Sequence, residues 1–146
     1  MKLMKVLWGV VVVLLLVGIL IPHCGYLHNR PDWNRTRHRM KSIIMAVKQY
    51  ETHYGVLPFD QERLPDSAEY DAFIARLEGD NARGVRFIEP GHDLDAWGRR
   101  YRIVLDADYD GKIRLTRLDQ PLFSDIVIWS DGEDPLTDED DVVSWE

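Results

Sequence analysis

The chain has 146 residues, 18 Lys and Arg, 25 Asp and Glu and a formal net charge of −7, which indicates one domain. The charge is divided: residues 1–53 carry a net charge of +6 and residues 54–146 a net charge of −13. The acidic part excludes nucleic acid as the expected partner, and the presence of one cysteine excludes an intrachain disulfide.

The N-terminal segment is strongly apolar. Residues 6–21 read VLWGVVVVLLLVGILI without a charge. If the helix starts upstream of Lys5, whose amine can reach the headgroups, it is about twenty residues long, which is enough to cross a bilayer. The sequence predicts an uncleaved membrane anchor. The alternative is a cleaved secretory signal, whose basic start would be Lys2 and Lys5. However, residues 21–24 (IPHC) contain no small-x-small cleavage site. The same residues also fit the signal for lipidation of the cysteine poorly.

The orientation of this anchor is not settled by its flanking charges. Five Lys and Arg residues follow the apolar segment within residues 30–41, against two Lys before it. The positive-inside rule alone therefore places the C-terminal part in the cytoplasm. The basic stretch can contact anionic headgroups, or it is simply the solvated start of a helix.

A break and then a long helix follow. Residues 22–31 contain two prolines and a glycine, so we expect a membrane anchor and linker at 1–31 and a globular domain at 32–146. A helix is predicted from the capping residue Asp32 to Gly55, because apolar residues recur every three or four positions. Its apolar face comprises Met40, Ile43, Ile44, Val47, Tyr50 and Tyr54.

A second, shorter helix is predicted next. Asp66 and Glu69 have the spacing of a capping box, and Gly79 ends the segment. The apolar stripe of this helix consists of Tyr70, Phe73, Ile74 and Leu77.

From residue 85 on, the apolar pattern has a period of two, which is typical of strands. The predicted strands are residues 85–88, 101–105, 112–115 and 126–129, followed by an apolar return at 142–145. Asp110-Gly111 is a hairpin signal between the second and third strands. The predicted fold class is therefore α+β, with an N-terminal transmembrane helix and an amphipathic helix packed on a small antiparallel β-sheet.

Signals of catalysis are weak. The chain has no Gly-rich phosphate loop and no Cys/His cluster at metal-binding spacing, and none of its five histidines has a serine or cysteine partner at a suggestive spacing. The sequence therefore predicts a non-enzymatic protein.

Two acidic segments remain as candidate cation sites. Residues 106–111 (DADYDG) match the start of an EF-hand loop, but the twelfth position is Arg117 where a bidentate Glu is needed, so a solvated hairpin tip is the preferred interpretation. Residues 130–141 contain seven acidic residues and no cation, and the apolar return after them fixes both ends of the loop. This second loop is either a calcium site or a solvated loop.

Four segments resemble the major pseudopilin of the type II secretion system, protein G, in the order of that family. Residues 47–58 (VKQYETHYGVLP) resemble the end of its long helix, and 95–101 (DAWGRRY) resemble its Asp-Pro-Trp-Gly-x-Pro-Tyr. Residues 128–134 (IWSDGED) resemble its strand with Ser-x-Gly-x-Asp-Gly, and 140–145 (DDVVSW) its closing Asp-Asp-Ile-x-x-Trp. The resemblance implies a pilin-like fold and a structural or accessory function in a type II secretion or pilus-like assembly. It implies copies of the chain or other pseudopilins as partners, and a single-pass inner-membrane protein with its domain on the periplasmic side.

The resemblance also implies a calcium ion in the C-terminal loop. The expected ligands are the carboxylates of Asp134, Asp138, Asp140 and Asp141, with carbonyl groups near Trp129 and Val143. Trp97 is expected to be a buried indole beside a tight turn at Gly98, and Trp145 to anchor the end of the acidic loop.

The N-terminus departs from the pseudopilin pattern. The family has Gly-Phe-Thr-Leu-x-Glu at the start of its helix, whereas residues 5–10 read KVLWGV and contain no Glu. The break at 22–31 also interrupts what is one long helix in the family. A second hypothesis is therefore a membrane-tethered binding module that uses a pilin-like domain without assembling into a filament.

Overall fold

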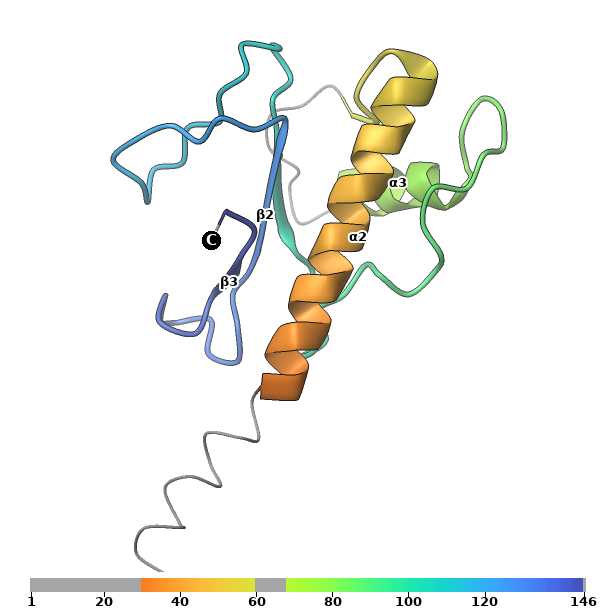
Figure 1. Cartoon of the computed structure of the whole chain (residues 1–146). Helices are drawn as coiled ribbons and strands as arrows, with labels where there is room; N and C mark the ends of the chain where they lie inside the picture. Colours follow the sequence, from red (N-terminus) through yellow and green to blue (C-terminus); the bar gives the residue numbers. More distant parts are fainter. Residues whose placement is uncertain (1–29, 60–67, 146) are drawn as a thin grey trace, which may run out of the picture. The chain divides into compact units, whose positions relative to one another are not determined.

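The computed structural model describes residues 30–59 and 68–145 (Figure 1). Its elements, in chain order, are α2 (Arg30–Tyr54), α3 (Ala68–Glu78), β1 (Arg102–Leu105), β2 (Ile126–Ser130) and β3 (Val142–Val143). Helices on a three-stranded antiparallel sheet confirm the predicted α+β class. The apolar segment 6–21, predicted as the anchor, lies outside the described residues. Among the described helices, none has the length and apolar character needed to cross a membrane.

Helix α2 is the longest element and begins two residues before the predicted start. Pro31 thus lies in its first turn, where the missing N–H of proline removes no intrahelical hydrogen bond. Gly55, with φ of 76°, ends the helix and donates to the carbonyl of Glu51 at 2.7 Å. The fully buried face comprises Thr36, Met40, Ile43, Ala46, Val47 and Tyr50.

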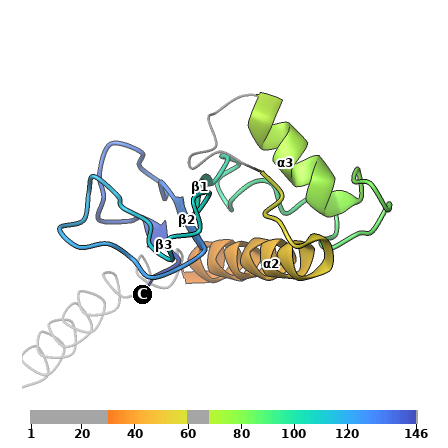
Figure 2. The same cartoon turned by 90° about the horizontal axis from the view of Figure 1, so that it is seen from above.

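Helix α3 buries the predicted stripe in full. Tyr70, Phe73, Ile74 and Leu77 are all buried, and Gly79 follows the helix with φ of 120°. The predicted cap at Asp66 lies outside the described residues. Buried residues of α2, α3 and one sheet face form a single core cluster, and Figure 2 shows both helices on the same side of the strands.

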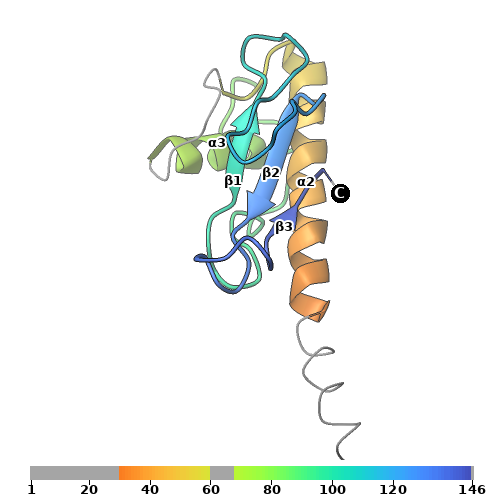
Figure 3. The same ribbon diagram turned by 90° about the vertical axis from the view of Figure 1, so that its left-hand side faces the viewer.

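The sheet has the order β1-β2-β3, with both pairs antiparallel, and Figure 3 shows the three strands side by side. Ile103 pairs with Ile128 and Leu105 with Ile126, and all four belong to the core cluster shared with the helices. Side chains alternate between faces along a strand, so Val104 and its partner Val127 point to the opposite side. There they form a second, smaller cluster with Ile113 and Leu115.

The strand predicted at residues 85–88 was wrong. The backbone N–H groups of Phe87 and Ile88 both donate to the carbonyl of Leu77, at 2.8 and 3.2 Å. Leu77 lies in the last turn of α3, where carbonyls lack intrahelical partners. The segment therefore completes the end of a helix, and its apolar side chains pack on the core without joining the sheet.

The hairpin predicted between 101–105 and 112–115 was also wrong. The partner of β1 is β2. The pairing continues one residue past β1, where the N–H of Asp106 donates to the carbonyl of Asp125 at 3.0 Å. Residues 112–115 turn away, and Ile113 forms an isolated antiparallel bridge with Leu122. The predicted strands 101–105 and 126–129 are confirmed as β1 and β2, and β3 covers the first two residues of the predicted return at 142–145.

Two buried tyrosines, one on α3 and one just before β1, bind backbone carbonyls of residues 93 and 94. The Tyr70 hydroxyl donates to the carbonyl of Asp93 at 2.6 Å, and the Tyr101 hydroxyl donates to the carbonyl of Leu94 at 3.3 Å. Burial is the main cause that raises the pKa of Tyr70 and of Tyr101 well above the ordinary value near 10. Both hydroxyls therefore stay protonated in the folded protein at a pH that ionises them in the unfolded chain.

We expect the free energy of unfolding to fall steeply above about pH 10. There the unfolded chain releases tyrosine protons that the native state retains, so stability that is present below pH 10 is lost as the pH rises. Urea unfolding between pH 8 and 11.5 measures the slope. Tyr70→Phe and Tyr101→Phe should each make the slope shallower, whereas Tyr109→Phe, at a 56% exposed tyrosine, should not. An unchanged slope in the double variant would contradict this assignment.

Candidate functional site

A buried aspartate organises the turn at residues 95–99. Asp95 is 3% exposed, and its Oδ1 accepts the N–H groups of Trp97 at 2.9 Å and Arg99 at 2.8 Å. Its Oδ2 accepts the hydroxyl of Ser130, at the end of β2, at 2.6 Å. Gly98 lies in the left-handed region with φ of 80°, as the predicted tight turn requires. One carboxylate thus closes the turn and ties it to the sheet.

Helix α2 holds the same turn from the other side. The N–H of Ala96 donates to the Thr36 hydroxyl at 3.0 Å, and Thr36 is fully buried. The Arg39 guanidinium donates to the carbonyl of Leu94 at 2.8 Å. The indole of Trp97 was predicted to be buried and is only partly so, packed against the core cluster. These contacts fix the position of the turn relative to α2.

The acidic loop, defined as residues 131–141, is attached to this turn. The Arg99 guanidinium donates to the carbonyl of Gly132 and, at 2.7 Å, to that of Glu133. The Ser130 hydroxyl, which donates to Asp95, also accepts the N–H of Gly132 at 3.2 Å. The start of the acidic loop is therefore held by the turn.

Asp140 closes the acidic loop on itself. Its Oδ2 accepts the N–H groups of Glu133 at 2.6 Å and Asp134 at 2.8 Å, and its Oδ1 accepts the Thr137 hydroxyl at 3.3 Å. A Cβ at Gly132, where φ is 61°, would overlap the Asp140 carbonyl oxygen and lie 2.6 Å from its Cγ. Glycine is therefore required at position 132 for this closure.

Arg117 neutralises the end of the loop. Its guanidinium lies 2.7 Å from Asp141, and the two side chains are 27% and 5% exposed. The same guanidinium lies 5.7 Å from the ring centres of both Trp129 and Trp145, within cation–π range. Burial raises the pKa of Asp141 above its ordinary value, and the hydrogen bond and charge of Arg117 oppose that rise. An internal cation is thus paired with one of the four carboxylates expected to bind calcium.

The four predicted calcium ligands do not converge in this arrangement. Both oxygens of Asp140 accept protein hydrogen bonds, Asp141 is paired with Arg117, and Asp134 Oδ1 accepts the N–H of Leu136 at 3.0 Å. Asp138 is exposed on the loop surface. Calcium needs six to eight oxygens around one point, so the donor set does not fit the ion without rearrangement of the acidic loop. Calcium binding there stays a prediction from the sequence.

The acidic residues that do converge are Asp106, Asp108 and Asp110. One carboxylate oxygen from each lies within 4.8 Å of the others, and no other such group of three occurs among residues 30–59 and 68–145. The interpretation of a simply solvated tip is wrong for Asp106, which is 4% exposed and accepts the N–H groups of Asp110 and Gly111 at 3.2 and 2.8 Å. Burial raises the pKa of Asp106 above its ordinary value. This geometry could admit a divalent cation, although the carboxylate already caps the turn.

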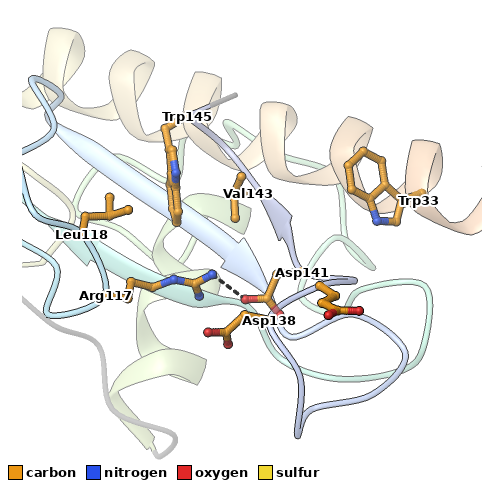
Figure 4. A pocket seen from close by; sticks show the side chains of 8 residues that line it. Trp33, Arg117, Leu118, Asp138, Asp141, Val143 and Trp145 are labelled. Carbon is orange, nitrogen blue, oxygen red and sulfur yellow. Dashed lines mark ion pairs between the residues drawn. The ribbon is translucent and has the colours of Figure 1, made fainter.

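A pocket of about 400 Å³ opens beside the acidic loop (Figure 4). It lies between the start of α2, the end of the acidic loop and the side chains that follow β3. Its lining residues are Trp33, Arg117, Leu118, Asp138, Glu139, Asp141, Val143 and Trp145. The wall therefore combines indole and aliphatic surfaces with three carboxylates and one guanidinium.

Three residues of this region were not predicted as functional. Arg117 attracted attention only because it is unsuitable at the twelfth position of an EF-hand loop. Trp33 donates its indole N–H to the carbonyl of Asp140 at 3.4 Å, and Arg99 holds the other end of the acidic loop. The available signal was the presence of arginines in an acidic domain, but the sequence does not say which carboxylate each arginine contacts.

No family model, curated protein or solved structure matches the chain.

We expect a chelator to leave the thermal stability of the wild-type protein unchanged to within about 1 °C, because Arg117 and Asp140 already satisfy the acidic loop. Differential scanning calorimetry of the full chain with EDTA, and then with millimolar calcium, measures this. A melting temperature that rises with calcium would contradict the expectation. If the rise is the same in Asp106→Asn and Asp108→Asn, it would support the ligand set predicted from the sequence. A rise abolished by those two substitutions would place the ion at residues 106–110.

Proposed function

We propose that this chain is a non-enzymatic, membrane-anchored, pseudopilin-like protein, a structural component of, or accessory to, a type II secretion or pilus-like assembly. One observation carries the proposal. Three segments on which the resemblance rests, residues 95–101, 128–134 and 140–145, meet in one hydrogen-bonded network although they are far apart in the sequence. Asp95 joins Ser130, Arg99 joins Glu133, and the Ser144 N–H donates to Ile128 at 3.0 Å.

The chemistry of that network supports a scaffold. The carboxylates of Asp95 and Asp140 accept N–H and O–H groups of the protein itself, and Asp141 is paired with an arginine. Hydrogen bonds to charged groups are among the stronger contributions to stability, about 1.5–3 kcal/mol each. The acidic side chains of the network thus stabilise one conformation of the C-terminal loop.

The arrangement of α2 supports the pseudopilin-like part. It runs along the sheet with its buried face in the core, and its first residue, Arg30, lies at the end of the break that follows the apolar segment in the sequence. An anchor on such a helix would hold the domain at the membrane surface. The periplasmic side is part of the proposal, against the Lys and Arg excess in residues 30–41, and it rests on the resemblance.

Membrane association and assembly are tested together in a bacterial host with a type II secretion system. The full chain and a variant that lacks residues 2–29 are expressed with a photo-cross-linking amino acid at Met45 or Phe123, which are 56% and 80% exposed. We expect the full chain in the membrane fraction, cross-linked to itself or to pilin-like subunits, and the truncated variant in neither state. The same amino acid at the buried Ile43 is the control and should give no adduct between chains.

Two outcomes would count against the proposal. If the full chain fractionates with soluble proteins, the predicted membrane anchor is wrong. A membrane-bound chain that cross-links only to unrelated proteins would favour the tethered binding module that does not assemble. Orientation is read separately, with Cys24→Ser and a new cysteine at the exposed Asp119: labelling by an impermeant maleimide in intact spheroplasts places the domain outside the cytoplasm.

A further inference from the structure

The pocket beside the acidic loop retains negative charge without a partner. Asp138 and Glu139 both line it and are exposed. No hydrogen bond or ion pair joins either of them to another residue in the described part of the chain, and the two other carboxylates nearby, on Asp140 and Asp141, are already engaged. Two adjacent carboxylates at the rim therefore attract a cation from outside the molecule.

The walls of the pocket suit an organic cation better than a bare metal ion. The Arg117 guanidinium lies over the ring of Trp145, and both residues line the pocket, which shows that this indole accepts a cationic side chain. Leu118 and Val143 add aliphatic surface. A lysine side chain has an apolar stem for such walls and an ammonium group for the carboxylates at the rim.

A complementary surface lies on α2 of the same chain. His38, Lys41 and Met45 are spaced three and four residues apart and share the exposed face of the helix. No hydrogen bond or ion pair within the described part of the chain involves the side chain of Lys41 or His38. Met45 is 56% exposed, so an apolar group lies beside the free cation of Lys41.

We propose that the pocket of one copy receives the Lys41–Met45 face of α2 from a second copy, with Lys41 paired to Asp138 and Glu139 and Met45 packed near Trp145. This inference rests on the proposed assembly function and names its partner surface. The pocket and the helix face are different surfaces of the chain, so each copy can offer one and receive the other. Contacts of this heterologous kind propagate from copy to copy. The acidic pocket repels anionic lipid headgroups, which favours a basic protein surface as the occupant.

Charge reversal on each side tests the contact. Sedimentation velocity of the purified full chain in detergent, with EDTA present, measures self-association. We expect Glu139→Lys and Lys41→Glu each to weaken association by about tenfold or more. Combining them should restore part of the loss, because the pair between positions 41 and 139 is reversed in direction while Asp138 stays acidic. Association should also weaken as salt rises from 50 to 500 mM.

Matched controls carry the same charge changes elsewhere. Asp80→Lys and Lys112→Glu reverse exposed charges at residues that do not line the pocket, and they should leave association unchanged. Thermal melts establish that each variant is folded, and a variant that unfolds is replaced by Glu139→Gln or Lys41→Gln.

Each other outcome overturns the inference. If the chain associates but the single reversals have no effect, or the double reversal fails to restore association, the surfaces are wrong while the proposed function stands. If the chain does not associate in EDTA but does so in a parallel run with millimolar calcium, a metal ion and not Lys41 occupies the pocket. If the chain neither associates in detergent nor cross-links to pilin-like subunits in cells, the proposed function fails as well.

Discussion

Replacing Asp95 with alanine is expected to lower the free energy of unfolding by about 3–5 kcal/mol. The substitution removes the acceptor of three hydrogen bonds, which are donated by the N–H groups of Trp97 and Arg99 and by the hydroxyl of Ser130. The site is buried, since Asp95 is 3% exposed. Unsatisfied buried donors each cost about 1–3 kcal/mol. Urea unfolding of the full chain measures the loss.

Two single hydroxyl groups that hold the same turn provide the controls: Ser130 donates to Asp95, and Thr36 accepts the N–H of Ala96. Ser130→Ala and Thr36→Val each remove one hydroxyl from the same network and should cost about 1–2 kcal/mol. Hydrogen exchange adds a readout of position: in Asp95→Ala, the amides of residues 132–134 should lose protection before those of β1, because the turn no longer holds the acidic loop. A loss below about 1 kcal/mol would show that the turn forms without its carboxylate.

Arg117→Met is expected to cost about 3 kcal/mol at pH 7, since it leaves the Asp141 carboxylate buried without its partner. Burial already raises the pKa of Asp141, and loss of Arg117 removes the influence that lowers it. The native variant then binds a proton more tightly than the unfolded chain. Its stability deficit relative to wild type should be largest at neutral pH and shrink as the pH falls toward the ordinary value near 4.

Denaturant unfolding between pH 4 and 8 provides the measurement. Arg117→Met with Asp141→Asn should recover much of the loss, because no uncompensated charge remains. Arg102→Met breaks a more exposed pair with Asp131, at 43% and 24% exposure, and should cost at most about 1 kcal/mol. A deficit in Arg117→Met that does not depend on pH would assign the effect to lost packing on Trp129 and Trp145.

The helices of this fold could be predicted closely from the sequence, and the connections less well. The spacing of Met40, Ile43 and Val47 identified the buried face of α2, because a 3.6-residue period that continues for about four turns is typical of a helix. The period of two at 85–88 and 112–115 was weaker evidence. Apolar and polar residues alternate over four positions as readily in irregular extended segments as in strands. The backbone of residues 87–88 binds the end of α3, and Ile113 forms a bridge with Leu122.

The C-terminal loop illustrates what charge counting leaves out. Seven acidic residues without a cation suggested a metal ion, because repulsion within the loop has to be relieved. In the structure, Arg117 pairs with Asp141 and Arg102 with Asp131, and Asp140 accepts two backbone N–H groups of the loop itself. Long-range partners of this kind depend on the tertiary fold, so the sequence pattern alone could not separate an ion site from a loop closed by the protein itself.

The turn at residues 95–99 also has a mechanical consequence. Tension that enters the domain along α2 passes through Thr36 and Arg39 into this turn, and from there through Ser130 into the central strand and through Arg99 into the acidic loop. The two bonds from α2 share the load in parallel, and so do the two bonds that leave the turn, while the two pairs act in series. A domain pulled by its first helix should therefore resist extension until both bonds of one pair break.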